Sequence, residues 1–224
     1  MAQKELKEHI MRLYDVSFST DSLRIRIALA EKGLSDQIEL VEIDISSSGH
    51  DEAPFADIYP GGAVPILELD DGTFVSGVTA ITEHLDNLDG SPVLTGTTQK
   101  ERALVQRMQR CAEQELFYAL GSYFYYGTPG GSTALEAFQL PRWDGRAEWA
   151  ALERERALSG MHYFDGVLAT QPYVAGDRFS MADITLWSAL HVASSLGIDE
   201  PPGCESLRAW HSEMCQRPAI RIPA

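Results

Sequence analysis

The stretch Tyr59–Ile81, YPGGAVPILELDDGTFVSGVTAI, decides how the first part of the chain folds. Its pattern predicts a strand after Val64-Pro65, a tight turn over residues 70–72, a second strand and the beginning of a helix. A proline at the head of a strand withdraws a donor from the sheet, which is tolerated at an edge or a strand start. X-Pro bonds adopt the cis form at low cost. The Val64–Pro65 peptide bond is therefore either an ordinary trans bond, or a cis bond that leaves the Val64 N–H and carbonyl free to pair with an extended ligand.

Composition and charge argue against several classes of function. The 224 residues carry a net charge of −15, which argues against binding to nucleic acid or an anionic membrane. No apolar run approaches the ~20 residues needed to cross a bilayer. The N-terminus, MAQKELKEH, is too polar for a secretory signal, so we expect a cytoplasmic protein.

Cysteine and histidine spacing gives no sign of a metal site. The three cysteines form no Cys-x-x-Cys pair and are expected to be reduced, mostly buried thiols. The six histidines are scattered without metal-ligand spacing. A phosphate-binding loop, a dinucleotide fingerprint and a Gly-x-Ser-x-Gly elbow are also missing from the sequence. We therefore expect no metal and no bound prosthetic group.

Apolar spacing in the first part alternates between strand and helix periods. Gly33 suits the C-terminal cap of the first helix. The order β-α-β-α-β-β-α predicts a mixed sheet covered by helices, which we assign to a domain spanning residues 1–88. The expected elements are strands at 10–16, 38–43, 66–69 and 73–75, and helices at 20–33, 51–58 and 77–88.

The second part of the chain contains no convincing strand. Residues 89–97 are rich in Gly, Pro, Ser and Thr, and we interpret them as a linker. We expect residues 98–224 to form an all-helical domain. Prolines and glycines interrupt the pattern over 127–144, so this stretch is either a loop or holds a short helix. The expected helices are 101–126, 146–169, 180–196 and 205–216.

A small α/β domain with a Val-Pro strand, followed by an all-helical domain, resembles the glutathione transferase family. The resemblance runs from residue 11 to about residue 218. It implies a thioredoxin-like domain that binds glutathione as cosubstrate, and a helical domain that carries a hydrophobic substrate site. It also implies a cytosolic homodimer of the serine type, bacterial in style, that acts in detoxification. The segments that carry the resemblance are LY (13–14), STDSLRIRIALAEKGL (19–34), YPGGAVPILEL (59–69) and YVAGDRFSMADITLW (173–187).

Such an enzyme must hold the thiol of glutathione as a thiolate, because the thiolate is the nucleophile. Lowering a thiol pKa from ~8.5 to ~6.5 requires roughly 2.7 kcal/mol. A hydrogen bond to a charged group supplies ~1.5–3 kcal/mol and a helix N-terminus adds ~0.3–1. The resemblance makes Ser19 the first candidate for this hydroxyl, Ser22 the second and Thr20 the third. The alternative is that Ser19, Thr20 and Asp21 only cap the helix. The Asp21 carboxylate would oppose a thiolate unless it points outward.

Two further glutathione contacts follow from the resemblance. The backbone of Val64, before Pro65, is expected to pair with the cysteinyl unit. His50 lies near the place where relatives offer a basic group to the glycyl carboxylate. Its alternative is an exposed loop histidine.

The γ-glutamyl end is the point where this chain departs from the family. The resemblance requires Glu-Ser at the start of the third helix, but the chain has Gly77-Val78. Each lost contact is worth roughly tenfold to a hundredfold in affinity. The Val78 amide can still receive a carboxylate at the helix N-terminus, and Ser76 and Thr79 could partly substitute.

Aromatic residues gather at the end of the first long helix of the helical domain. Tyr118, Tyr123, Phe124 and Tyr126, with Tyr125 between them, offer an apolar wall with hydroxyls for orientation. We expect this wall to hold a hydrophobic or aromatic electrophile. The alternative is that about half of these side chains belong to the core, because five aromatics on one helix cannot all face one pocket.

Three functional hypotheses remain open from the sequence. The first is an enzyme whose Ser19-held thiolate attacks an electrophile in conjugation, reductive dehalogenation, ether cleavage or isomerisation. The second is a non-catalytic binding or scaffold protein on the same fold, favoured by Gly77-Val78. The third is a disulfide reductase, which usually requires a cysteine at position 19 or 21, and this chain has none there.

Overall fold

The computed structural model describes residues 11–43, 64–127 and 145–221. The described residues divide into two compact units, the first up to Gly90 and the second from Ser91 onward. The division falls inside the segment 89–97, whose role as a linker stays a prediction, as do the domain limits. The predicted helix over 51–58 lies outside the described residues.

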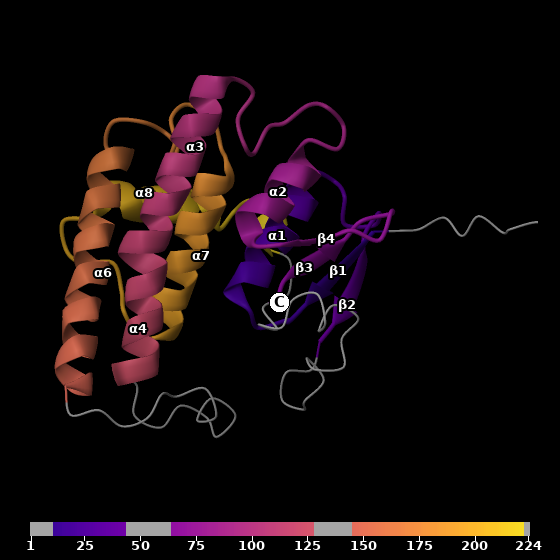
Figure 1. The fold of residues 1–224 in the computed structure, drawn as a ribbon. Coiled ribbons are helices and arrows are strands. Elements are labelled where there is room, and N and C mark those ends of the chain that lie inside the picture. The colour runs from indigo at the N-terminus through magenta and orange to yellow at the C-terminus, as the bar shows by residue number, and fades with distance from the viewer. Residues whose placement is uncertain (1–10, 44–63, 128–144, 222–224) are drawn as a thin grey trace, which may run out of the picture. The chain divides into compact units, whose positions relative to one another are not determined.

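A four-stranded mixed sheet with strand order β2-β1-β3-β4 forms the first unit. Strand β1 (Arg12–Asp15) runs parallel to β2 (Glu39–Glu42) and antiparallel to β3 (Ile66–Glu68), which pairs antiparallel with β4 (Phe74–Ser76). Helices α1 (Thr20–Glu31) and α2 (Val78–Asp86) pack against each other (Figure 1). The predicted fold is confirmed, and the strand ends differ from the prediction by at most two residues.

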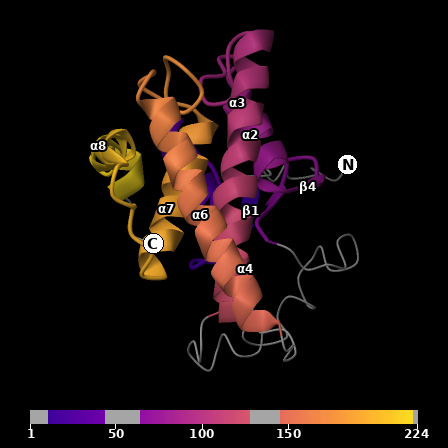
Figure 2. The ribbon, with the colours of Figure 1, turned by 90° about the vertical axis from the view of Figure 1, so that its left-hand side faces the viewer.

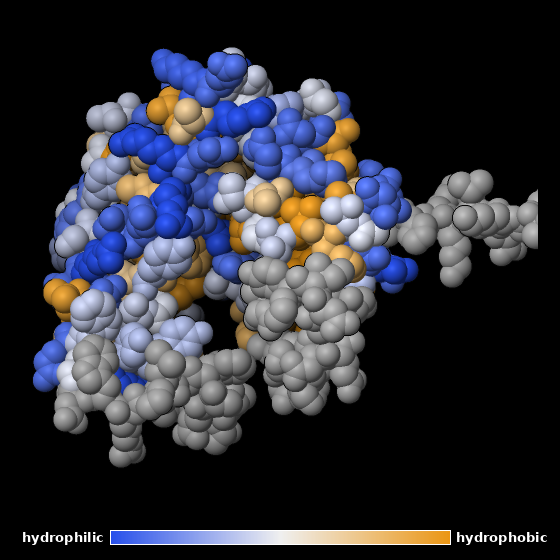
Figure 3. Space-filling model, in the orientation of Figure 1, coloured by the Kyte–Doolittle hydropathy of each residue, from blue (hydrophilic) through white to orange (hydrophobic). Residues whose placement is uncertain are grey.

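Both faces of the central strands are apolar, because successive side chains point to opposite sides of a sheet. Leu13 and Leu67 are paired across β1 and β3, and both are fully buried. The next pair, Tyr14 and Ile66, forms a second cluster, against which Phe74 packs. In the view of Figure 3, apolar residues accordingly gather over this unit, whereas polar residues dominate the same view of the helical unit.

Helix α1 ends where the sequence predicts. Gly33 has φ 65°, a left-handed conformation that glycine adopts without a Cβ penalty. Its N–H donates to Ala30 at 3.1 Å, and the Leu34 N–H donates to Leu29 at 2.8 Å. These two bonds satisfy carbonyls at the helix end and stop the helix.

The named elements of the second unit are all helices among the described residues, and non-helical segments connect them. Helices α3 and α4 form one long rod in which a π-helical segment joins them, and α6 lies alongside α4 (Figure 2). The four predicted helices are present, but the π-helical segment was not predicted. The helices are α3 (Gln99–Ala112), the π-helical segment Glu113–Phe117, α4 (Tyr118–Gly127), α6 (Arg146–Leu168), α7 (Met181–Ser195), α8 (Glu205–Met214) and a final 3-10 turn, Pro218–Arg221.

A close approach between α6 and the π-helical segment explains Gly160, which lies within α6. A Cβ added to Gly160 would lie 3.0 Å from the Glu115 carbonyl oxygen and 3.1 Å from a Leu116 methyl carbon. Glycine costs ~1 kcal/mol in a helix interior relative to alanine. Here it allows α6 to pack directly on the backbone of the widened turn.

Helix α7 forms the centre of the helical unit. Every residue from Met181 to Leu190 is buried, as expected of a helix that is surrounded on all sides. No helix among the described residues is both long and apolar enough to cross a membrane.

A capping box formed by Ser180 and Asp183 begins α7, and it is buried. The Ser180 N–H and hydroxyl donate to Asp183 Oδ2 at 2.9 and 3.0 Å. Asp183 Oδ1 accepts from the Val174 N–H at 2.9 Å and from the Trp210 indole N–H at 3.3 Å. Burial raises the pKa of Asp183 to about 6, although these bonds favour the carboxylate. The motif joins three parts of the helical unit and supports its fold.

Candidate functional site

Ser19 lies at the N-terminal end of α1, where it serves as the N-cap. Its backbone is extended, with φ −73° and ψ 129°, and its Oγ accepts from the Ser22 N–H at 3.4 Å. This bond uses one lone pair, so the hydroxyl can still donate its proton elsewhere. The side chain is partly exposed. Capping and thiolate binding are therefore compatible roles for the same hydroxyl.

The other two hydroxyls near Ser19 differ in exposure. Ser22 is fully buried, and its Oγ accepts from the Val16 N–H at 3.4 Å. Thr20 is the first residue of α1 and is partly exposed. Burial argues against Ser22 as a ligand contact and leaves Ser19 as the stronger candidate.

The carboxylate of Asp21 is held by a neighbouring guanidinium. Arg24 Nη2 lies 2.6 Å from Asp21 Oδ1, one helical turn away. The Asp21 side chain is 50% exposed. Its charge is thus paired and solvated, which reduces its opposition to a thiolate at Ser19.

Tyr14 on β1 carries another hydroxyl close to this loop in sequence. It is 4% exposed, and its hydroxyl donates to Glu68 Oε2 at 2.8 Å. Burial and the bond to Glu68 both raise the pKa of Tyr14. The Tyr14 proton is therefore committed to Glu68, and Ser19 is better placed to donate to a thiolate.

The bond between Val64 and Pro65 is cis, the second of the two alternatives considered for the sequence. Val64 is half-buried against the cluster of Tyr14 and Ile66, and Pro65 is buried. Pairing of the Val64 backbone with glutathione stays a prediction. The predicted contact His50 lies outside the described residues.

The start of α2 offers main-chain groups rather than side chains. Gly77 is the N-cap, with φ 86° and no side-chain capping bond. A Cβ at Gly77 would meet nothing within 4 Å, but the positive φ favours glycine. Val78 is 6% exposed, whereas Ser76 is partly exposed and Thr79 is exposed. A γ-glutamyl carboxylate at this helix end would therefore meet backbone amides and nearby hydroxyls.

The predicted aromatic wall divides into two parts along α4. Tyr118 begins the helix, is 53% exposed, and its hydroxyl accepts from Arg110 Nη1 at 2.9 Å. Tyr123, Phe124 and Tyr126 are partly buried and belong to its last turns. Tyr118 is thus tied to α3, and the other three form a separate group.

Arg146 fixes the end of α4 that carries this group. Its Nε donates to the Tyr126 carbonyl at 2.6 Å, and its Nη2 donates to the Tyr125 carbonyl at 3.0 Å. Both carbonyls would otherwise lack a partner within the helix. The aromatic end of α4 is therefore anchored to the first turn of α6.

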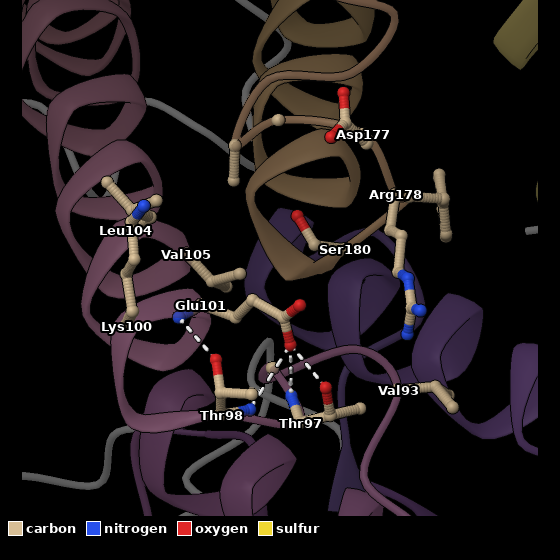
Figure 4. A pocket seen from close by; sticks show the side chains of 14 residues that line it. Val93, Thr97, Thr98, Lys100, Glu101, Leu104, Val105, Asp177, Arg178 and Ser180 are labelled. Atoms are coloured by element: carbon tan, nitrogen blue, oxygen red, sulfur yellow. Dashed lines mark hydrogen bonds between the residues drawn. The ribbon is translucent and has the colours of Figure 1, made fainter.

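A cavity of approximately 470 Å³ lies elsewhere in the helical unit, and the sequence did not predict it (Figure 4). The described residues that line it come from the segment 93–98, the start of α3 and the segment 175–180. Glu101 lies at its centre, where its carboxylate accepts from the N–H and hydroxyl of Thr97 and from the Thr98 N–H. Bonds from Thr97 lower the pKa of Glu101, so its charge completes the cap of α3.

The cysteines are free, but only one is buried, so the prediction of mostly buried thiols was wrong. Cys204 is buried, Cys111 is partly exposed and Cys215 is exposed, because Cys215 follows the last turn of α8. Burial raises the pKa of both Cys111 and Cys204. Within the described ranges, no group of three or more His, Cys, Asp or Glu side chains could hold a metal ion.

Comparison with known proteins agrees with this geometry. Residues 18–88 match the family model described as Glutathione S-transferase, N-terminal domain, and residues 117–218 match Glutathione S-transferase, C-terminal domain. The sequence is 43% identical to Glutathione S-transferase 2 of Saccharomyces cerevisiae over 94% of this chain and 88% of that protein.

Two solved structures are similar over nearly the whole chain. The crystal structure of Gtt2 from Saccharomyces cerevisiae superposes with a TM-score of 0.82 at 43% identity, covering 93% of this chain and 98% of that one. A glutathione S-transferase domain-containing protein from Marinobacter aquaeolei VT8 gives 0.83 at 39% identity, covering 93% and 99%. These findings confirm the predicted family, fold, enzyme type and cosubstrate, glutathione. The chain belongs to the glutathione S-transferase family.

Proposed function

We propose that this protein holds the thiolate of glutathione at the Ser19 hydroxyl and directs it at a hydrophobic or aromatic electrophile. The observation that carries this proposal is the state of Ser19, which caps α1 through one lone pair and stays partly exposed. The positive end of the α1 dipole lies at the same point. A thiolate there would accept the Ser19 proton and interact favourably with the helix N-terminus.

The chemical step needs no metal in this proposal. The thiol proton passes to solvent, and the sulfur lone pair then forms a bond to an electrophilic carbon. In a substitution, the bond from that carbon to its leaving group breaks and the leaving group departs as an anion. Reductive dehalogenation, ether cleavage and isomerisation begin with the same thiolate, so Ser19 would serve each of them.

The remaining parts of the site are assigned on the same basis. The Val64 backbone and the start of α2 (Ser76, Gly77 and Val78) would hold the tripeptide. Tyr123, Phe124 and Tyr126, with Tyr118 at the other end of α4, would contact the electrophile through apolar surface. We further propose a cytoplasmic homodimer that acts in detoxification.

A second candidate is a binding or scaffold protein that keeps the fold without efficient thiol chemistry. It is favoured by the start of α2, where Gly77 has no side chain and Val78 is buried. In that case glutathione would bind weakly or not at all, because the γ-glutamyl ammonium would lack the family's carboxylate partner.

Titration calorimetry with glutathione, followed by an assay with a chlorinated aromatic, separates the two candidates. The enzyme predicts measurable binding and a ten- to hundredfold lower kcat/KM in Ser19→Ala, which corresponds to roughly 1.4–2.7 kcal/mol of lost stabilisation. Thr20→Ala is the matched control and should retain activity. Absence of binding at millimolar glutathione would support the scaffold.

A further inference from the structure

Arg26 lies on α1, two turns after Ser19, and reaches back to the loop that carries this serine. Its side chain is 12% exposed. Nη1 lies 2.5 Å from Asp15 Oδ2, and Nη2 donates to the Ser17 carbonyl at 2.7 Å. The guanidinium thus joins the end of β1, the loop and the helix through a rigid fork.

The Ser17 residue is held at both its N–H and its carbonyl. Its N–H donates to Glu42 Oε1 on β2 at 3.1 Å, while its carbonyl accepts from Arg26. Two residues later, the Ser19 N–H donates to the Val16 carbonyl at 2.9 Å and closes the turn. The position of the Ser19 hydroxyl therefore depends on contacts that Arg26 makes.

Arg26 also balances a buried negative charge beside this loop. Asp15 is 3% exposed, and within the described structure its Oδ1 is buried and accepts no hydrogen bond. A buried carboxylate without its cation would be costly, and its field would oppose a second anion nearby. Arg26 contacts both Asp15 and the loop, so one side chain serves both purposes.

We propose that Arg26 is a positioning residue of the transferase, which sets the Ser19 loop and screens Asp15 so that the glutathione thiol ionises readily. This inference rests on the proposed role of Ser19. Among the described residues, Glu42 on β2 also contacts the loop, through the Ser17 N–H, and the Asp21–Arg24 pair lies at the start of α1. Removal of Arg26 would leave the buried Asp15 carboxylate without its cation, which disfavours a thiolate nearby.

The test is the pH titration of bound glutathione, followed by the ultraviolet absorbance of its thiolate. Arg26→Gln should raise the pKa of the bound thiol by about one unit, and kcat/KM below that pKa should fall about tenfold. Glutathione affinity in the thiol form should change little, because Arg26 is not assigned a ligand contact. Arg26→Lys keeps the charge and should recover part of the shift. Arg12→Gln removes the cation paired with Glu39 on β2 and should leave the titration unchanged.

Each outcome decides the inference. An unchanged thiol pKa in folded Arg26→Gln would overturn it. If that variant does not fold, Arg26→Lys takes its place: lysine keeps the charge but lacks the planar fork that contacts both Asp15 and the Ser17 carbonyl, so the thiol pKa should rise by less than one unit, and an unchanged thiol pKa would overturn the inference. If Ser19→Ala itself leaves the thiol pKa unchanged, the proposed function fails, and that result is independent of Arg26.

Discussion

Two serines begin helices in the described part of the chain, Ser19 and Ser180, and they are used differently. Ser180 begins α7, is 2% exposed, and gives both its N–H and its hydroxyl proton to the Asp183 carboxylate. Ser19 begins α1, is partly exposed, and accepts one bond from the Ser22 N–H. The Ser180 hydroxyl therefore donates its proton within the fold, whereas the Ser19 hydroxyl can still donate its proton to a ligand.

The residue three positions after each serine accounts for the difference. The Asp183 carboxylate accepts hydrogen bonds from Ser180, Val174 and Trp210. This cap therefore connects three segments of the helical unit. The Ser22 hydroxyl instead accepts from the Val16 N–H, so it does not accept the proton of the Ser19 hydroxyl. A serine that begins a helix can donate its hydroxyl proton to a ligand when the residue three positions later does not accept that proton.

The largest expected effect is at the structural cap. Asp183→Ala removes four accepted hydrogen bonds and a buried partner of Trp210, which should lower the free energy of unfolding by about 3–5 kcal/mol. Denaturant unfolding followed by tryptophan fluorescence measures it. A loss below ~1 kcal/mol would mean that the junction contributes little and would weaken the contrast between the two caps.

The next effect depends on pH. Burial raises the pKa of Asp183 from 3.8 to about 6, so between these values the folded state keeps a proton that the unfolded state releases. Stability contributed by this proton should be present near pH 4 and lost as the pH rises to 6, by up to about 3 kcal/mol. Asp183→Asn cannot titrate and serves as the reference.

We therefore expect the variant to gain stability relative to the unmodified protein across this interval. The opposite trend, in which Asp183→Asn falls behind as the pH rises, would show that the four accepted bonds outweigh burial. Unfolding curves of both proteins at pH 4, 5 and 6 would distinguish the two trends.

The smallest effect sharpens the comparison most directly. Ser180→Ala and Ser19→Ala each remove a capping hydroxyl, and each should cost about 1 kcal/mol of stability. Only Ser19→Ala should also reduce glutathione-dependent turnover of the folded protein. Equal activity losses in the two variants would contradict the division of roles.

The sequence predicts the first unit well because its signals are local. The turn over 70–72 separates two short apolar strands, and Gly33 ends α1 with the two bonds expected of a glycine cap. The aspartate of the Ser180 capping box lies three residues after the serine, so its return bond to the Ser180 N–H could also be predicted from spacing.

Features that depend on tertiary contacts could not be predicted in this way. The π-helical segment 113–117 lies where Gly160 allows α6 to pack on its backbone. The sequence around residues 113–117 does not indicate this contact, and neither does the sequence around Gly160. Residues 89–97 have the composition of a linker, but Leu94 is buried and its carbonyl accepts from the Met181 N–H. Burial of Leu94 is a tertiary contact that the composition of the segment does not indicate.

The site shows the same limit. Ser19 could be selected from the resemblance, but capping and thiolate binding predict the same residue at the same helix end. Arg26 was missed because its contacts with Asp15 and Ser17 depend on how α1 folds back over the loop. The only sequence signal was a basic residue two turns into the helix.

The central claim is that the Ser19 hydroxyl stabilises a glutathione thiolate, and the titration of bound glutathione in the unmodified protein and in Ser19→Ala tests it most directly. We predict a bound-thiol pKa of ~6.5 in the first, about two units below free thiol, and a return toward ~8.5 in the second. Identical titration curves for the two proteins would contradict the claim.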